Sequence, residues 1–588
     1  MGKQSKYIKV IKQLPLIVSI LAVLAVVYYL GFFHQPLEQE VLHWIFLSAI
    51  CVSGIAIVAR YFFRSMRPKW RILPYDILLI LLIVLVFLQV DIFFGDRFIF
   101  SQILPRRFFL FLAILLGFIR EFSTGIFDFR RMIFNPAQLF ILSFLVIILV
   151  GGGLLLLPNA THTGISGIDA MFTSTSAVCV TGLVVVDTGS FFTEFGHYII
   201  LILIQLGGIG IMTFTSYFSY FFKAGSSYEN QLLLSSMTNT EKIGEVFVTL
   251  KKIIFITFIV EGIGALIIFQ SIDVEVIPSF LDRVFFSVFH SVSGFCNAGF
   301  STLGNGFYEP AFRFNYPLHL IIALLIILGG IGFPIVFNLL KYIKNYFRNV
   351  WLIVLGKRSQ IHLPRIINVH TRIVLITSLI LTVAGTLLFF VFEYNNTLSE
   401  HSFVGKIVTS FFGSVTTRTA GFNTVDTSSL SILTVMLVVF LMWVGASPGS
   451  TGGGIKTSTF AIAILNFIAL ARGKQKIEVF RREIAQNSVN RAFAIIFLSI
   501  LVIFVSIFFI SLFDIEKGLT NISFECVSAF GTVGLSRGIT AELSNPSKFV
   551  LILTMFAGRV SMLTILIAVF KKMAHHKYHF PTEEVLIN

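Results

Sequence analysis

Long apolar runs alternate with shorter, more polar segments along most of this chain. Four apolar runs come first, at residues 14–33, 44–63, 77–94 and 108–119. Three of them are about as long as a helix that crosses a bilayer, and the fourth is shorter. From about residue 135 the spanning runs are separated by short segments rich in Ser, Thr, Gly and Phe. The pattern predicts an all-α polytopic membrane protein.

Four of the short segments can be aligned on one glycine. They read TSTSAVCVTGL, HSVSGFCNAGF, FGSVTTRTAGF and ECVSAFGTVGL, and the shared positions are Gly182, Gly299, Gly421 and Gly534. In this alignment a Phe stands ten positions before each glycine, at Phe172, Phe289, Phe411 and Phe524. The copies lie about 110–120 residues apart, which indicates a fourfold internal repeat.

Each short segment lies between two apolar runs. The leading runs are 139–157, 253–269, 373–392 and 492–513, and the trailing runs are 198–222, 318–340, 432–470 and 549–570. Each repeat is therefore predicted to form a helix, a short helix with a loop, and a second helix. With the first four runs, this predicts about twelve spans. The predicted units are an N-terminal extension, 1–132, and repeats at 133–225, 226–345, 346–472 and 473–588.

Composition supports a membrane protein over a soluble one. Hydrophobic residues make up 56% of the chain and charged residues 12%, with a mean hydropathy of +0.90, whereas soluble proteins have about 25% charged residues. The net charge of +15 lies between the apolar runs, so it indicates membrane orientation and excludes a nucleic-acid partner. Basic loops at 60–71, 341–372 and 472–482 predict a multi-pass protein of the cytoplasmic membrane with both termini cytoplasmic.

Enzymatic and cofactor-binding motifs are missing from the sequence. Its four cysteines have no CxxC spacing, and the chain has no HExxH and no Walker-type loop. The GGIG stretches at Gly207 and Gly329 lie within apolar runs and do not follow a strand. We therefore expect neither an enzyme nor a bound cofactor.

The broken segments have a physical explanation as a cation path. Non-helical backbone at membrane depth survives only inside protein or beside water. Carbonyl oxygens at the end of a short helix can replace the hydration shell of a cation, and glycine permits the tight return of the chain. No carboxylate ring is present, which favours monovalent cations. The predicted carbonyl donors are Val180, Thr181, Gly182, Asn297, Ala298, Gly299, Thr419, Ala420, Gly421, Thr532, Val533 and Gly534. The alternative is that the glycines only allow close helix packing.

A second glycine-rich stretch, GASPGSTGGGIK at 445–456, interrupts the third trailing run. Its glycines and Pro448 cannot continue a straight helix, so it is predicted to form a loop at mid-membrane that can close the path. A kinked helix is the alternative. The predicted gating residues are Gly445, Gly449, Gly452, Gly453, Gly454, Lys456 and Arg559.

Other charged residues of the apolar regions are interpreted as structural. Arg418 is expected to tie its loop to surrounding protein, and Lys456 to anchor the 445–456 stretch, whereas Arg559 is expected either to anchor it or to take part in gating. Glu261 and His290 are expected to be structural partners. Ser166 and Ser279 stand three residues before an Asp, as helix N-caps do.

From about residue 135 to the C-terminus the chain resembles the Trk/Ktr/HKT superfamily of cation transporters, most closely the bacterial potassium-uptake membrane subunits. The resemblance is carried by TSAVCVTGLVVVDT, HSVSGFCNAGFSTL, SVTTRTAGFNTVD, SAFGTVGLSRG and GASPGSTGGGIKTSTF. It implies four M1-P-M2 repeats (helix, re-entrant pore loop, helix) with pseudo-fourfold symmetry around one pore, glycines that select K⁺, and a gating loop. It also implies a homodimer and a cytosolic nucleotide-binding subunit of the RCK type. Ser561 and Met562 depart from an expected Gly-Pro.

Two other transport mechanisms remain open from the sequence. One is a symporter of the same fold that couples potassium to sodium or protons. The other is a less selective transporter of sodium and potassium. The usual signs of an alternating-access symporter, inverted halves with carboxylates at mid-membrane, are missing, and the leading prediction is a gated potassium pore in the lipid bilayer.

Overall fold

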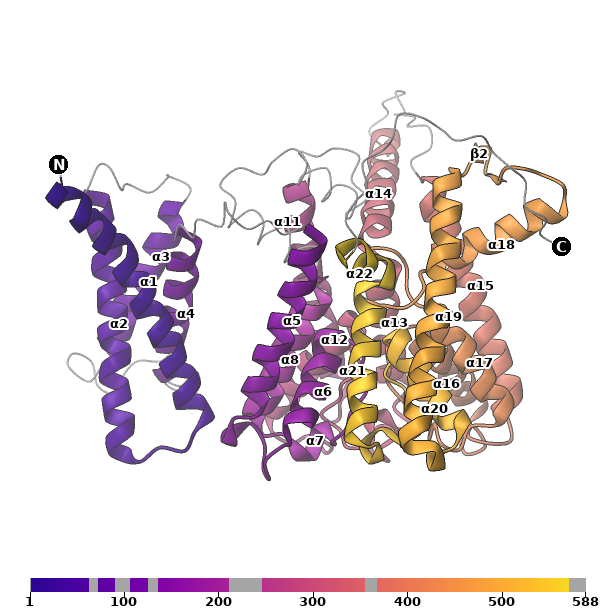
Figure 1. The fold of residues 1–588 in the computed structure, drawn as a ribbon, viewed down its shortest axis with the longest axis horizontal. Helices are drawn as coiled ribbons and strands as arrows, with labels where there is room; N and C mark the ends of the chain where they lie inside the picture. Colours follow the sequence, from indigo (N-terminus) through magenta and orange to yellow (C-terminus); the bar gives the residue numbers. More distant parts are fainter. Residues whose placement is uncertain are drawn as a thin grey trace.

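The computed structural model describes residues 2–62, 72–89, 106–124, 136–210, 246–354 and 367–569. These residues are mostly helical (Figure 1). The strands among them are β1 (Glu478–Val479) and β2 (Arg482–Glu483), which form a small antiparallel hairpin.

The N-terminal helices form a bundle with its own core. They are α1 (Gly2–Gly31), α2 (Pro36–Phe62), α3 (Leu73–Gln89) and α4 (Arg106–Thr124). Phe46, Ile57 and Leu79 are among the buried residues between them. The bundle is drawn in indigo and stands beside the rest of the chain in Figure 1.

Buried ion pairs hold one end of this bundle together. Arg120 Nε lies 2.9 Å from Asp76 Oδ1, and Arg120 Nη1 lies 2.9 Å from Glu121 Oε1. Arg60 Nη2 lies 2.7 Å from Glu121 Oε2, and Tyr61 donates a hydrogen bond to Asp76. Charged groups in an apolar bundle are stable only with such partners, so the network fixes α2, α3 and α4 relative to one another.

The bundle meets the remaining helices near the end of α1. Asn159, in the 3₁₀ turn η5 (Pro158–Ala160), donates hydrogen bonds to the carbonyl oxygens of Leu30 at 3.0 Å and Phe32 at 3.1 Å. The Leu157 side chain packs against Gly31. In the described part of the chain, these contacts join the N-terminal bundle to the remaining helices at the end of α1.

Twelve helices of the rest fall into four consecutive groups of three. Their bounds are α5 (Pro136–Leu155), α6 (Gly167–Val178), α8 (Glu194–Gly208); α11 (Val246–Ser271), α12 (Phe280–Cys296), α13 (Tyr316–Ile331); α15 (Val369–Glu393), α16 (Phe403–Thr416), α17 (Ile432–Trp443); α19 (Gln486–Asp514), α20 (Leu519–Gly531), α21 (Asn545–Val560). The middle helix of each group packs against the first helix of the same group.

The groups also contact one another in a closed order. The last helix of each group packs against the middle helix of the next: α8 on α12, α13 on α16, and α17 on α20. The fourth group closes the circle, because α21 packs on α6. In Figure 1 the yellow α21 accordingly lies next to the purple α6, although about 370 residues separate them.

The same hydrogen bond recurs where the middle helices meet the first helices. Ser174 donates to the carbonyl oxygen of Ile148 at 2.7 Å, Ser291 to that of Glu261 at 2.6 Å, and Ser414 to that of Thr382 at 2.9 Å. In each case a glycine one turn further along the first helix lies against the serine hydroxyl: Gly151, Gly264 and Gly385. A small residue at this position lets two helices approach closely in an apolar medium.

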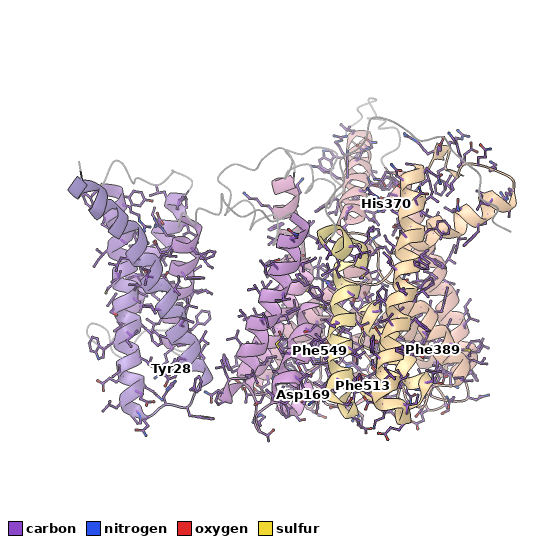
Figure 2. All side chains as sticks on the ribbon, in the orientation of Figure 1. Tyr28, Asp169, His370, Phe389, Phe513 and Phe549 are labelled. Atoms are coloured by element: carbon purple, nitrogen blue, oxygen red, sulfur yellow. The ribbon has the colours of Figure 1, made fainter. Side chains whose placement is uncertain are left out.

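Serine caps start three of the middle helices. Ser166, Ser279 and Ser402 accept hydrogen bonds from the amides of Asp169, Asp282 and Gly405. The predicted capping role of Ser166 and Ser279 is confirmed. Figure 2 shows Asp169 at the same end of the molecule as Phe389, Phe513 and Phe549, with His370 at the opposite end of α15.

The trailing helices differ from the prediction of continuous spans. The run 318–340 breaks at Gly332, where φ is +93°, and α14 (Phe333–Val354) continues at an angle of 100° to α13. The run 549–570 breaks at Ser561, before α22 (Met562–Val569). The helix from the run 198–222 ends at Gly208, and residues 211–222 lie outside the described residues.

Helix length and composition identify fewer spans in the described residues than the twelve or so predicted for the whole chain. In the described part of the chain, five helices are long and apolar enough to cross a membrane, or six if the bent pair α13 and α14 is one span. Shorter apolar helical segments of 10–17 residues lie in the same part of the chain. Two of them, Ile432–Trp443 and Thr457–Ala471, belong to the third trailing run and are separated by the break at 445–456.

Candidate functional site

The four predicted glycine loops have the same backbone geometry. We define them as residues 179–183, 296–300, 418–422 and 531–535. Each loop glycine has positive φ: +88° at Gly182, +71° at Gly299, +78° at Gly421 and +92° at Gly534. The residue two positions earlier is also left-handed, with φ between +49° and +70°, at Val180, Asn297, Thr419 and Thr532. The loops therefore reverse the chain in the same way after each middle helix.

The four glycines lie against one another in a circle. A β-carbon on Gly182 would lie 2.5 Å from the Ala298 carbonyl oxygen, and one on Gly299 would lie 2.7 Å from that of Ala420. In the same sense, a β-carbon on Gly421 would clash with the Val533 carbonyl oxygen and one on Gly534 with that of Thr181. Each loop thus abuts the next, and the fourth abuts the first. The structure brings together the four glycines and the four carbonyls that precede them.

Two of the residues that stand two before a loop glycine, Thr419 and Thr532, contact the 445–456 segment. The Asn297 and Thr419 side chains are hydrogen-bonded at 3.2 Å. The Thr532 hydroxyl accepts a hydrogen bond from the Gly453 amide at 3.0 Å. For these residues the structure places a side chain, and not only a carbonyl, in contact with neighbouring loops.

Hydroxyl groups of the middle helices hold the loops from behind. Ser176 Oγ accepts from the Gly182 amide at 3.0 Å, and Ser528 Oγ accepts from the Gly534 amide at 3.1 Å. Ser293 donates to the Phe300 carbonyl oxygen, and Thr416 donates to that of Phe422, both at 2.7 Å. The sequence shows this row of hydroxyls but not its role.

The third repeat is out of register with the other three by one residue. Its anchoring hydroxyl, Thr416, stands five residues before its glycine, whereas Ser176, Ser293 and Ser528 stand six before theirs. Accordingly Phe412, and not the predicted Phe411, is the fully buried counterpart of Phe172, Phe289 and Phe524. The connection from helix to glycine is one residue shorter in this repeat.

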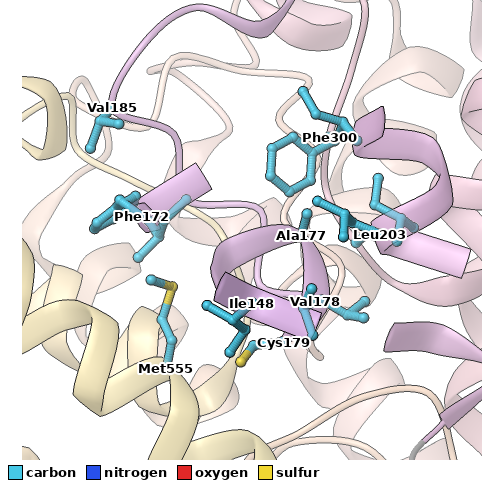
Figure 3. Packing of buried hydrophobic residues seen from close by; sticks show 14 of the residues in the cluster. Ile148, Phe172, Ala177, Val178, Cys179, Val185, Leu203, Phe300 and Met555 are labelled. Atoms are coloured by element: carbon cyan, nitrogen blue, oxygen red, sulfur yellow. The ribbon is translucent and has the colours of Figure 1, made fainter. Parts of the chain in front are cut away.

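Apolar packing fixes the first loop. Figure 3 shows Val178 and Cys179, at the end of α6, surrounded by side chains from other helices, including Ile148, Leu203 and Met555. Val178, Cys179 and Val180 are fully buried. Since Met555 belongs to α21 of the fourth group, the loop position depends on packing between groups as well as within the first group.

The 445–456 segment joins α17 to α18 (Thr457–Ala471) and lies against three groups. The Ser447 amide donates to the Gly330 carbonyl oxygen at 3.0 Å, and the Phe333 amide donates to that of Gly449 at 3.0 Å. Gly452 lies against Thr419, and Gly453 against Thr532. The predicted interruption of the third trailing run is therefore present, and the segment packs directly on the glycine loops.

Two basic side chains hold this segment. Lys456 Nζ donates to the carbonyl oxygens of Gly452 at 2.6 Å and Gly453 at 3.2 Å, so it is a loop anchor as predicted. Arg559 donates to the Thr451 carbonyl oxygen and, at 2.5 Å, to that of Gly207 in α8. Gly445 packs against Gly453 and Gly454. All seven predicted gating residues therefore lie in or against the 445–456 segment, and within it Gly449 packs against Pro334.

The remaining predicted partners are also placed. Arg418 donates to the Ser378 carbonyl oxygen at 3.3 Å and to the Thr382 hydroxyl at 2.5 Å, so it ties the third loop to α15. His290 Nε2 lies 2.9 Å from Ser301 Oγ. Sequence reasoning missed Glu525, a buried carboxylate that accepts hydrogen bonds from Ser536, Arg537 and Thr540 after the fourth loop. The sequence does contain a signal for it, because Glu525 stands nine residues before Gly534, as His290 stands nine residues before Gly299.

Comparison with known proteins identifies the relatives of this chain. It is 35% identical to the Ktr system potassium uptake protein B of Bacillus subtilis, over 77% of this chain and 96% of the relative. It is 34% identical to the potassium/sodium uptake protein NtpJ of Enterococcus hirae, over 77% of this chain and 97% of the relative. The crystal structure of the potassium transporter TrkH from Vibrio parahaemolyticus matches with a TM-score of 0.58 at 17% identity, covering 85% of this chain and 97% of that one.

The relatives agree with a match to a protein family. The model of the TrkH family, described as cation transport protein, matches residues 129–579. That range includes all four glycine loops, the 445–456 segment and Arg559, and it begins after α4. The chain belongs to the TrkH family of cation transport proteins.

Proposed function

We propose that this protein is the membrane-spanning pore subunit of a potassium uptake system and not an enzyme. The single observation that carries the proposal is the closed circle of glycine loops, in which each glycine abuts a carbonyl of the next loop. Four backbone turns on one axis are the arrangement that lets carbonyl oxygens replace the water around an alkali cation. The relatives are named as potassium uptake proteins, and K⁺ is accordingly the proposed cargo.

The proposed architecture is four M1-P-M2 repeats with pseudo-fourfold symmetry, within 133–225, 226–345, 346–472 and 473–588, preceded by the extension 1–132. The closed packing of the four helix groups supports it. The middle helices end at the loops, so the negative ends of their dipoles favour a cation there. Permeation is proposed to use the carbonyls of the twelve residues given above as filter donors.

The 445–456 segment is proposed as the gate. It lies directly against Thr419 and Thr532, the residues that begin the turns of the third and fourth loops. A glycine-rich segment can change its backbone conformation at low cost, whereas Lys456 and Arg559 hold it in the conformation described here. Opening then requires the loss or exchange of these carbonyl contacts.

Partners and location follow as further parts of the proposal. The protein is placed in the cytoplasmic membrane with both termini cytoplasmic, as a homodimer that works with a cytosolic nucleotide-binding subunit of the RCK type. Basic residues between the apolar runs support this orientation. In Figure 1, α1 begins and α22 ends toward the same side of the molecule.

A Gly182→Ser substitution tests the filter. Its Cβ would lie 2.5 Å from the Ala298 carbonyl oxygen and 3.0 Å from Gly299 Cα, at a φ of +88° that side chains rarely adopt. We expect the ratio of K⁺ to Na⁺ flux in proteoliposomes to fall about tenfold, as a displacement costing about 1.4 kcal/mol would give. Gly167→Ser is the matched control, because a β-carbon there meets nothing within 4 Å. An unchanged flux ratio in folded G182S protein would contradict the filter assignment.

One comparison favours a second candidate, sodium-linked or less selective transport. The Enterococcus hirae relative is named a potassium/sodium uptake protein. Potassium uptake by the purified protein without any sodium or proton gradient supports the uncoupled pore. A strict requirement for either gradient supports a symporter of the same fold.

A further inference from the structure

Glu261 is a buried carboxylate within a membrane span that the proposed permeation path does not use. It lies on α11, in the span Lys251–Ser271, and is 4% exposed. The Gln205 amide group donates to both of its oxygens, at 3.2 and 3.0 Å. Glu261 has no ion pair among the described residues. A carboxylate in this position is costly and is a default candidate for a functional role.

The carboxylate also reaches the second glycine loop. Cys296 Sγ lies 3.6 Å from Glu261 Oε1 and donates to it. Cys296 ends α12 and stands three residues before Gly299. The neighbouring helix α8 packs on the same cysteine, because a β-carbon on Gly208 would lie 2.6 Å from Cys296 Cβ. Glu261 therefore sits where α8, α11 and the second loop meet.

Two other repeats also have a contact at the position that Glu261 occupies in the second repeat. Glu261 is the residue whose carbonyl accepts from the serine of the middle helix, and its counterparts are Ile148 and Thr382. Each of these three residues lies close to the residue that stands three positions before the glycine of its own loop. Figure 3 shows Ile148 beside Cys179 in the first repeat, and Thr382 accepts a hydrogen bond from Arg418 in the third.

The second and third repeats thus place an ionisable side chain at this contact. In the second repeat the side chain is an acid on the first helix, and in the third it is a base on the loop. The first repeat has an apolar contact at this place. A hydrogen bond adds a directional contact to apolar packing, so the second and third loops are held by both.

We propose that Glu261 is a positioning residue that fixes the second glycine loop against α8 and thereby maintains ion discrimination. Its carboxylate holds Cys296, and Cys296 begins the turn that places the Ala298 carbonyl against Gly182. Glu261 does not touch the ion. The inference rests on the proposed function, since it assigns a determinant of selectivity to the loops proposed as the filter.

The test uses full-length protein in proteoliposomes, with K⁺ and Na⁺ flux and thermal unfolding measured together. Glu261→Ile installs the residue that the first repeat has at this position. We expect its ratio of K⁺ to Na⁺ flux to fall about tenfold, which corresponds to about 1.4 kcal/mol, because the hydrogen bond to the second loop is lost, while conduction persists. Glu261→Gln keeps an oxygen acceptor for Cys296 and is expected to restore the ratio to within about threefold of wild type.

Glu393→Gln is the matched control. Glu393 is also fully buried, and it accepts from the Ser431 amide at 2.9 Å and from the Asn396 side chain at 2.8 Å, at the end of α15. Its substitution is expected to leave the flux ratio unchanged. An unchanged ratio in folded Glu261→Ile protein overturns the proposal, and so does a loss in Glu393→Gln equal to that in Glu261→Ile.

Cys296→Ala decides the question if Glu261→Ile does not fold. It keeps the carboxylate but removes its contact with the loop, so it is expected to lower the flux ratio in the same way, and an unchanged ratio overturns the proposal. The experiment distinguishes failure of the proposed filter from failure of the proposed role of Glu261. Wild-type protein that does not discriminate K⁺ from Na⁺ refutes the filter, whereas discriminating wild type with equally discriminating variants refutes only the role of Glu261.

Discussion

At the scale of single residues, four residues with side chains have a left-handed backbone conformation, which usually favours glycine. Val180, Asn297, Thr419 and Thr532 have φ between +49° and +70°, a conformation that costs about 1–2 kcal/mol for a residue with a β-carbon. The cost is offset because the bond from the Thr181 amide to the Ser176 carbonyl, at 2.8 Å, and its counterparts can form only with this turn. The strain coincides with the proposed filter, as strain often does with functional sites.

Ser561 is another residue with a β-carbon and positive φ. It has φ of +72° and ψ of 124° between α21 and α22, where Gly332 occupies the corresponding break after α13 at φ +93°. We expect Ser561→Gly to stabilise the protein by about 1 kcal/mol because glycine adopts this conformation without steric cost. The measurement is the midpoint of thermal unfolding in detergent.

Ser561→Ala is the control for that prediction. It removes the hydroxyl but retains the β-carbon, so it is expected to give no stabilisation. If the alanine variant were as stable as the glycine variant, the backbone explanation would be wrong.

The residue pattern predicted where the four loops lie better than it predicted the register of the third middle helix. The four glycines stand out because each must adopt positive φ, which the sequence marks by glycine itself. The one-residue shift of Phe412 and Thr416 could not be read from a gapless alignment of short segments. It depends on which hydroxyl reaches the loop carbonyl in three dimensions.

At the scale of elements, the 445–456 segment and the fourth glycine loop are joined by one described hydrogen bond between the Gly453 amide and the Thr532 hydroxyl. Thr532→Val removes this acceptor at nearly constant volume. We expect basal K⁺ flux without a cytosolic partner to rise severalfold, since a buried amide left without its acceptor destabilises the closed segment by about 1–3 kcal/mol. Flux into proteoliposomes measures the effect.

Thr173→Val provides the comparison for Thr532→Val. Thr173 is also buried, but its hydroxyl has no hydrogen-bond partner among the described residues. Its substitution is expected to leave basal flux unchanged. Equal flux in wild type and the Thr532→Val variant would argue against control of the proposed gate by this contact.

Element boundaries were predictable where the sequence changes character and not where it stays apolar. The caps at Ser166 and Ser279 and the glycine-rich 445–456 segment are visible as local composition. The break at Gly332 is not, because Leu318–Leu340 reads as one apolar run and the bend is stabilised by contacts of Gly332 and Phe333 with Pro448 and Gly449. Contacts between residues so far apart in the sequence leave no pattern in the local sequence around the break.

At the scale of the whole molecule, the N-terminal bundle and the family region are separate in sequence and share few described contacts. The family match begins at residue 129, after α4, and the bundle has its own core and ionic network. We therefore expect the bundle to be dispensable for permeation itself.

Arg120→Leu tests this separation. It leaves Asp76 and Glu121 without one of their buried partners, and breaking such a pair costs about 3–5 kcal/mol. We expect hydrogen exchange to rise throughout α2–α4, whereas K⁺ flux stays within about twofold of wild type. Arg107→Leu is the control, because Arg107 contacts Tyr29 and Gln39 near the surface and pairs with no buried acid among the described residues. A loss of flux with Arg120→Leu would tie the bundle to transport.

The circle of glycine loops is built from one polypeptide, and this has an evolutionary consequence. In a ring of identical subunits every substitution would be repeated fourfold, so a mild change would be multiplied around the axis. Here the second and third repeats have different contacts, made by Glu261 and by Arg418. Gene duplication followed by divergence can therefore change the proposed filter one loop at a time.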